Sequence, residues 1–156
     1  MTTVNQANES ALTEYVTATI GGQLFGLPIS RVQDVFKPER LTRVPLASND
    51  IAGVLNLRGR IVTAIDMRAR LRLPKGEADR RPMAVGVELR GESYGLLIDS
   101  IGEVMKLPDE GREVNPANLD RRTAELSAGV YRLDGQLMVV LDVDRVLEIA
   151  PDKLAA

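Results

Sequence analysis

Two carboxylates, Asp66 and Asp142, each end an apolar run and precede a short stretch of helical spacing. Two acids brought together in a fold could act as an acid–base pair in hydrolysis. Alternatively, each aspartate caps the helical turn that follows it, because its side-chain oxygen accepts free backbone N–H groups. Both positions belong to an internal repeat and a cap is needed once in each copy, so the sequence favours capping over catalysis.

The 156 residues include no His and no Cys. This composition excludes His–Ser and His–Cys nucleophile pairs, a phosphoryl-accepting imidazole, imidazole and thiolate metal ligands, and disulfides. No glycine-rich phosphate-binding motif is present either. We therefore expect no enzymatic activity, no catalytic residue, no metal and no cofactor.

The charge is distributed unevenly along the chain. Residues 1–57 carry a net charge of −1, residues 58–81 of +5 and residues 82–156 of −6. The basic stretch suits an acidic partner or a solvated linker, and its arginines could contact phosphates: Arg68, Arg70, Arg72, Arg80 and Arg81. No aromatic residues are interleaved with them, so nucleic-acid binding stays an alternative only.

Arg58 lies in the segment 56–59, Asn-Leu-Arg-Gly, whose repeat counterpart is 132–135, Arg-Leu-Asp-Gly. The Leu and the Gly recur, which indicates a core residue and a turn glycine. Arg58 does not recur, so the fold alone does not require it. An arginine beside a turn can bind a carboxylate through two parallel N–H bonds, although most such arginines are ordinary surface residues.

Short runs of branched residues separated by glycine turns predict a chain made mostly of strands. The predicted strands are 15–20, 23–27, 41–45, 54–57, 61–65, 83–89, 94–98, 102–107, 130–133 and 137–141. Helical spacing predicts helices over 30–36 and 142–149. Residues 1–12 are expected to be a disordered tail. Neither a signal peptide nor a membrane-spanning run is apparent, which favours a cytoplasmic protein without membrane insertion.

An internal repeat organises these elements. Residues 25–36 parallel residues 94–105, and residues 52–59 parallel residues 128–135, in the same order. The matches indicate a duplicated unit of about five strands, and two such units can form small barrels around one shared core. We place subdomain 1 at 13–72, a linker at 72–82, subdomain 2 at 83–142 and a closing helix at 142–149, all within one domain at 13–150.

The segments 25–35 (FGLPISRVQDV), 51–71 (IAGVLNLRGRIVTAIDMRARL), 94–107 and 128–147 resemble the CheW family over about residues 15–149. The resemblance implies an all-β fold of two SH3-like five-stranded barrels sharing an apolar core, with short helices. It also implies a non-enzymatic adaptor that couples transmembrane chemoreceptors, the methyl-accepting chemotaxis proteins, to the histidine kinase CheA. Such a protein works in the cytoplasm, at receptor arrays beneath the inner membrane. A small carboxylate-dependent hydrolase and a nucleic-acid-binding barrel are the alternatives.

The resemblance also implies two binding surfaces. Residues expected in the groove for the receptor's cytoplasmic tip are Val32, Asp34, Gly53, Arg58, Ile101 and Val104. Residues expected to face the regulatory domain of the kinase are Leu41, Val44 and Pro45. Asp34 stands where the family commonly has Glu. If the fold is the family's, Asp34 and Arg58 are neighbours, and Asp34 can accept a hydrogen-bonded ion pair from Arg58.

Overall fold

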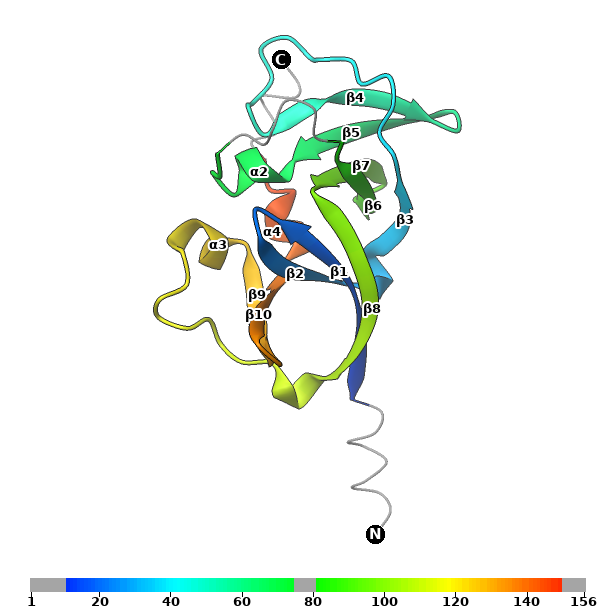
Figure 1. Cartoon of the computed structure of the whole chain (residues 1–156). Coiled ribbons are helices and arrows are strands. Elements are labelled where there is room, and N and C mark those ends of the chain that lie inside the picture. Colours follow the sequence, from blue (N-terminus) through cyan, green and yellow to red (C-terminus); the bar gives the residue numbers. More distant parts are fainter. Residues whose placement is uncertain (1–10, 75–80, 150–156) are drawn as a thin grey trace.

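The computed structural model describes residues 11–74 and 81–149, which form two five-stranded sheets (Figure 1). Sheet 1 has the strand order β8-β1-β2-β10-β9, made of β1 (Leu12–Ile20), β2 (Gln23–Pro28), β8 (Ser100–Pro108), β9 (Ser127–Leu133) and β10 (Gln136–Leu141). Sheet 2 has the order β3-β6-β7-β5-β4, made of β3 (Val32–Phe36), β4 (Ile51–Leu57), β5 (Arg60–Asp66), β6 (Met83–Leu89) and β7 (Glu92–Ile98). The predicted all-β class is confirmed.

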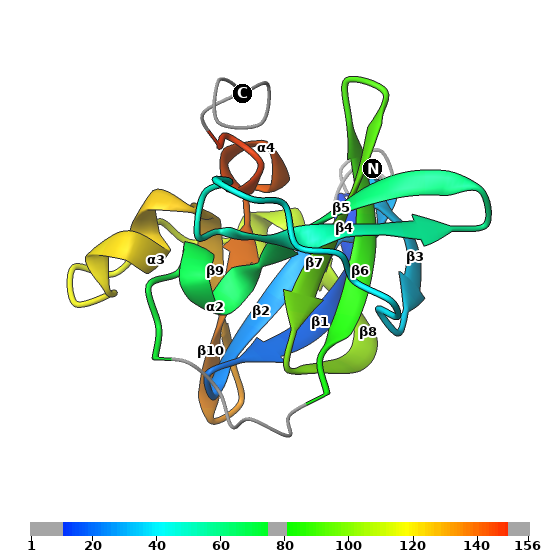
Figure 2. The same ribbon diagram turned by 90° about the horizontal axis from the view of Figure 1, so that it is seen from above.

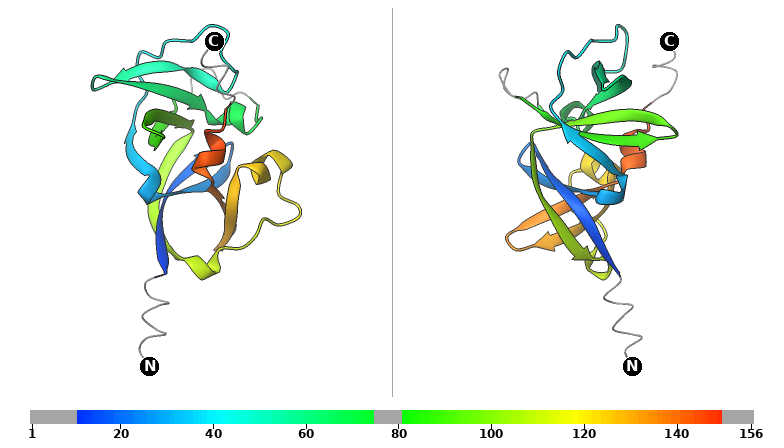
Figure 3. Two further views of the ribbon diagram at one scale, coloured as in Figure 1. Left: turned by 180° about the vertical axis from the view of Figure 1, so that it is seen from behind. Right: turned by 90° about the vertical axis from the view of Figure 1, so that its right-hand side faces the viewer.

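Each sheet takes strands from both copies of the repeat. Sheet 1 combines the β1–β2 hairpin of the first copy with β8, β9 and β10 of the second, and sheet 2 combines the β6–β7 hairpin with β3, β4 and β5. Sheet 2 fills the upper part and sheet 1 the lower part of the views in Figures 1 and 3. This membership differs from the division at 13–72 and 83–142, because β3 and β8 each leave the preceding hairpin and cross to the other sheet. Each hairpin then finds a parallel partner in the other copy, β2 with β10 and β7 with β5.

The apolar core lies between the two sheets and joins them. Its main cluster contains buried side chains from both, among them Phe25 and Leu141 from sheet 1 and Ile65 and Leu96 from sheet 2. Burying such a side chain stabilises a fold by about 1.5–3 kcal/mol. Side chains of both sheets therefore form one shared apolar core, as predicted.

In each sheet, one backbone bridge links the chain that follows one edge strand to the edge strand on the opposite side. Thr42 pairs with Val54 of β4, and Glu113 pairs with Val130 of β9, at matching places in the two sheets. The glycine before each bridged valine has a positive φ, +152° at Gly53 and +133° at Gly129. A Cβ on Gly53 would overlap the carbonyl oxygen of Thr42. The recurring Ala-Gly-Val of the repeat is therefore explained by close backbone approach.

The predicted aspartate caps are confirmed. The Asp66 carboxylate accepts the backbone N–H groups of Arg68 and Ala69 at the start of α2 (Met67–Arg70). The Asp142 carboxylate accepts the N–H of Arg145 in α4 (Val143–Val146). A further short helix, α3 (Arg121–Glu125), is capped by Asp120. The helix predicted over 142–149 is thus real but shorter.

Two predicted elements are wrong. Residues 30–36 form no helix: one 3-10 turn at Ile29–Arg31 leads into β3, which pairs with β6. The branched side chains that fitted a helical period also suit a strand, and pairing with β6 decides between the two. The strand predicted over 41–45 is reduced to the bridge at Thr42. Most of the tail at 1–12 and of the linker at 72–82 lies outside the described residues.

Candidate partner-binding surface

Arg58 occupies the turn of the β4–β5 hairpin, which projects from the edge of the molecule (Figures 1 and 2). Arg58 has φ +54° and Gly59 has φ +83°, the two left-handed residues that a tight hairpin turn requires. The Asn56 Oδ1 accepts the Gly59 N–H at 2.9 Å and fixes the turn. The Arg58 side chain is 78% exposed, so the turn presents a guanidinium to solvent.

Asp34 of β3 lies beside Arg58, as predicted. The Arg58 Nη1 and Asp34 Oδ2 are 3.7 Å apart, which is an ion pair longer than the predicted hydrogen bond. Asp34 follows an irregularity in the β3–β6 pairing and faces Gly86 of β6. A Cβ on Gly86 would overlap the Asp34 Oδ1, so the glycine leaves room for the carboxylate to lie across β6. Asp34 and Arg58, together with Phe36 and other side chains, line an open pocket.

The other four residues expected in the receptor groove lie apart from the Arg58–Asp34 ion pair. Val32 of β3 and Ile101 of β8 are half-buried, and both pack against the shared core, so they lie where the two sheets meet. Val104, also on β8, is 50% exposed. Gly53 is buried beneath Thr42 and has the architectural role described above. Only Arg58 and Asp34 are brought into a direct polar contact with each other.

The three kinase candidates lie in the loop of residues 37–50. Leu41 and Pro45 are exposed and Val44 is half-buried. The next residue, Leu46, was missed by sequence reasoning: it is 97% exposed and has φ +65°. Such exposure of a large apolar side chain beside others is typical of a protein contact. The only sign of this exposure in the sequence is that Leu46 follows a Pro in a run without hydrophobic period.

Hydrogen bonds at both ends hold this loop in place. Thr42 exchanges two backbone hydrogen bonds of 2.8 Å with Val54, and the carbonyl of Asp50 accepts the N–H of Asp66 at 2.8 Å. Inside the loop, the carbonyl of Ser48 accepts the N–H of Ile51 at 2.9 Å. The apolar side chains are therefore presented from a fixed backbone.

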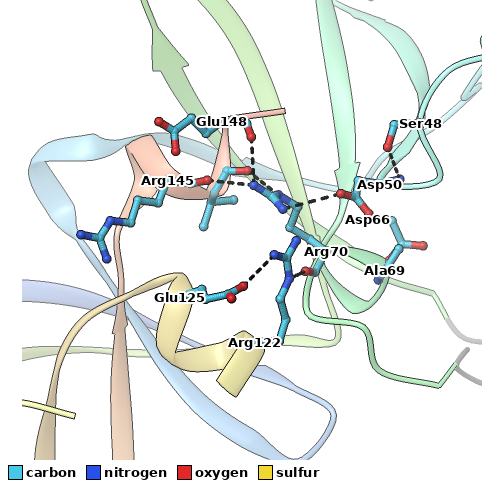
Figure 4. Close-up of polar contacts among 10 residues, drawn as sticks. Ser48, Asp50, Asp66, Ala69, Arg70, Arg122, Glu125, Arg145 and Glu148 are labelled. Atoms are coloured by element: carbon cyan, nitrogen blue, oxygen red, sulfur yellow. Dashed lines mark hydrogen bonds and ion pairs between the residues drawn. The ribbon is translucent and has the colours of Figure 1, made fainter. Parts of the chain in front are cut away.

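Arg70 forms a buried network at the end of α2, drawn in Figure 4. Its guanidinium donates to the carbonyls of Val146 at 2.8 Å, Arg145 at 2.9 Å and Glu148 at 3.2 Å. The Asp50 carboxylate lies 3.7 Å from its Nη1. Burial lowers the pKa of Arg70 from its ordinary value, yet the side chain stays charged because arginine titrates far above neutral pH.

The arginines proposed to contact phosphates are thus not a common surface. Arg70 is only 6% exposed, and Arg68 forms a two-bond ion pair with Asp99, at 2.9 and 2.7 Å. Arg72 and Arg81 are exposed, and Arg80 lies outside the described residues. One signal could have revealed Arg70: its counterpart in the repeat is Val146, a core residue.

Within residues 11–74 and 81–149, no group of three or more acidic side chains is arranged to hold a metal ion. In the same part of the chain, no helix has the length and apolar character needed to cross a membrane. The two aspartates considered as an acid–base pair are both occupied as helix caps.

Comparisons with known proteins agree with this architecture. The family model of the CheW-like domain matches residues 14–150. The chain is 25% identical to the chemotaxis protein CheW of Klebsiella aerogenes over 141 residues, 90% of this chain and 85% of that protein. It is 26% identical to the chemotaxis protein CheW of Bacillus subtilis over 129 residues, 83% of each chain.

A solved structure matches the fold as well. The crystal structure of the scaffolding protein TtCheW from Thermoanaerobacter tengcongensis superimposes with a TM-score of 0.77 and 25% sequence identity. The superposition covers 88% of this chain and 89% of that one. Family model, relatives and structure all extend over both sheets, and the chain therefore belongs to the family of CheW-like domains.

Proposed function

We propose that this protein is a non-enzymatic chemotaxis adaptor that couples chemoreceptors, the methyl-accepting chemotaxis proteins, to the histidine kinase CheA. The observation that carries the proposal is the CheW-like match over residues 14–150, which covers both sheets. The names of the relatives, chemotaxis protein CheW and scaffolding protein, support it. We place the protein on the cytoplasmic side of the membrane, within receptor arrays.

The receptor surface is centred on Arg58 and Asp34. The family resemblance implies a helical receptor tip, and an amphipathic helix docks through an apolar stripe with a few charges that orient it. Val32 and Ile101 supply half-buried apolar contacts, and Arg58 supplies the charge. Because the Arg58–Asp34 separation of 3.7 Å leaves the guanidinium N–H groups without a short bond to Asp34, they remain able to donate to a carboxylate of the receptor.

The kinase surface is centred on the loop of residues 37–50. Leu41, Val44, Pro45 and the fully exposed Leu46 supply an apolar contact on a fixed backbone. Thr42 of the loop pairs with Val54 in the middle of β4, whereas Arg58 directly follows the end of that strand. Four residues of extended strand separate these positions by about 13 Å. The two surfaces therefore lie at different positions along β4, and we propose that each takes its own partner.

The test is a pull-down with a receptor cytoplasmic fragment and the kinase. The wild-type protein should retain both partners at once. Arg58→Ala should lose the receptor and keep the kinase, and Leu46→Asn should do the reverse. Asparagine tolerates the positive φ at this site, so Leu46→Asn removes the apolar contact without straining the loop. Failure of the wild type to bind either partner contradicts the proposal.

The two alternative functions gain no support. A carboxylate-dependent hydrolase would need Asp66 and Asp142 free of their helix caps. A nucleic-acid-binding barrel would need the arginines of α2 on the surface, whereas Arg68 is paired with Asp99 and Arg70 is buried.

A further inference from the structure

The two halves of the chain are arranged around one another with approximate two-fold symmetry. We call residues 11–74 the N-half and residues 81–149 the C-half. Replacing each strand of sheet 1 by its repeat equivalent turns the order β8-β1-β2-β10-β9 into β3-β6-β7-β5-β4, the order of sheet 2. Each half thus gives a hairpin to one sheet and three strands to the other. The molecule has the form of a dimer of halves in which the hairpins are exchanged.

Arg70 marks the place where equivalent parts of the halves meet. Helices α2 and α4 are equivalent in the repeat, and Arg70 of α2 corresponds to Val146 of α4. The Arg70 Nε donates to the carbonyl of Val146 at 2.8 Å, so the two equivalent residues touch. The contact is asymmetric, because one partner is a buried cation and the other a buried apolar residue.

Two ion pairs across the halves show the same asymmetry. Arg68 of α2 binds Asp99, which follows β7, with Nη2–Oδ2 at 2.7 Å. Asp144 of α4 binds Arg31, which follows β2, with Nη2–Oδ1 at 2.9 Å. Arg68 and Asp144 are equivalent in the repeat, and Asp99 and Arg31 lie at neighbouring equivalent positions. The geometry is repeated with the charges reversed, so in both pairs the cation belongs to the N-half.

The net charges of the two halves have the same signs as their side chains in these ion pairs, positive for the N-half and negative for the C-half. The N-half carries nine basic and five acidic side chains, a net charge of +4, and the C-half carries eight basic and thirteen acidic ones, a net charge of −5. Opposite net charges favour encounter between unlike halves and oppose encounter between like ones.

We propose that the N-half and the C-half recognise each other specifically, and that their interface holds without the covalent connection between residues 74 and 81. Two copies of the N-half would place Arg68 of one copy beside Arg31 of the other and Arg70 beside Arg70. Two copies of the C-half would place Asp144 beside Asp99. Like charges in these positions penalise both self-pairings, and a buried unpaired cation costs more than a surface one. The surface that each half presents therefore fits one partner, the other half.

The test uses the full chain with a protease site in place of residues 75–80, cleaved after folding. We expect the two fragments to elute together as a 1:1 complex with a melting temperature that rises with protein concentration, since a two-chain complex unfolds by dissociation. The uncleaved protein with the same replacement is the control. Separation or precipitation of the fragments after cleavage, with the control still folded, overturns the proposal.

Pairing specificity is measured on the same cleaved protein. Two cleaved samples that differ in mass are mixed in mild denaturant, allowed to exchange, and analysed by native mass spectrometry. We expect four N-half–C-half complexes and no pair of like halves. Like pairs in amounts near those of random mixing contradict the proposed specificity.

A charge-exchange series tests the cause. In the cleaved protein, Asp99→Arg should lower the affinity between the two halves about 100-fold. Adding Arg68→Asp should raise that affinity again by at least tenfold. Asp144→Arg with Arg31→Asp repeats the test at a more exposed pair, where folding is not at risk, with an expected loss of about fivefold and a similar recovery. A reversed charge that leaves the affinity unchanged, or a double exchange that restores nothing, contradicts the electrostatic explanation.

Discussion

Replacing Arg58 by Ala should separate receptor binding from folding. The guanidinium lies 3.7 Å from the Asp34 carboxylate and its side chain is 78% exposed. At the dielectric constant of water this separation corresponds to about 1 kcal/mol, and exposed pairs contribute roughly 0.2–1 kcal/mol. Since 1 kcal/mol shifts the melting temperature of a domain of this size by roughly 2–4 °C, we expect Arg58→Ala to melt within about 3 °C of the wild type.

Receptor affinity should respond much more strongly. Truncating one partner of a desolvated charge pair costs about 2–5 kcal/mol, so Arg58→Ala should weaken receptor binding at least thirtyfold. Binding is measured by calorimetry with a receptor cytoplasmic fragment, and kinase affinity without receptor should stay nearly constant. Arg58→Lys should recover only part of the affinity, because an ammonium lacks the planar fork. Arg90→Ala is the matched control, because Arg90 is exposed and stands before Gly91 in the β6–β7 turn with φ +53°, the same backbone setting as Arg58. A large drop in melting temperature with receptor affinity intact would mark Arg58 as structural and refute this reasoning.

Three further predictions concern the fold. Asp142→Ala should lower the free energy of unfolding, measured in urea, by about 1 kcal/mol because α4 loses its cap. Asp142→Asn keeps a side-chain acceptor and should cost less, so equal losses for the two variants would contradict capping. Gly53→Ala should lower the free energy of unfolding by about 2 kcal/mol or more, because the added Cβ would meet Thr42. Gly59 also has a positive φ but no atom near the place of a Cβ, so Gly59→Ala should cost about half as much. A larger loss for Gly59→Ala would exclude close approach as the cause. Burial raises the pKa of Tyr131, so the folded state keeps its proton above pH ~10 while the unfolded state loses it, and stability should fall as pH rises further. Tyr131→Phe should flatten that fall above pH ~10, and an unchanged slope there would rule Tyr131 out.

The sequence predicted best those features that depend on nearby residues. The caps at Asp66 and Asp142 follow from one side chain and the N–H groups of the next turn, and the structure has both. The strand predicted over residues 83–89 matches β6. The helix predicted over residues 30–36 failed because Val32 and Phe36 fit both periods; pairing with the distant strand β6 decided for β3, in which Val35 lies on the exposed face. The nearness of Asp34 and Arg58 came from the family resemblance and holds in the structure.

The features that the sequence left hidden depend on contacts between distant segments. Exchange of the hairpins between sheets is set by the pairing of β2 with β10 and of β7 with β5, and no local pattern encodes it. Arg70 belongs to a basic run, and its buried place depends on residues 145–148 of the other half, where three backbone carbonyls accept from its guanidinium. The exposure of Leu46 follows from anchors at Thr42 and Asp50 on either side of it.

The measurement that tests the central claim most directly is kinase activity in a reconstituted array. Receptor-containing vesicles and CheA are combined with increasing amounts of this protein, and autophosphorylation of the kinase is followed. The adaptor account predicts strong, attractant-sensitive activity only when all three components are present, and its loss with Arg58→Ala or Leu46→Asn. Receptor-controlled kinase activity that is the same without this protein, or that survives both substitutions together, would contradict the account.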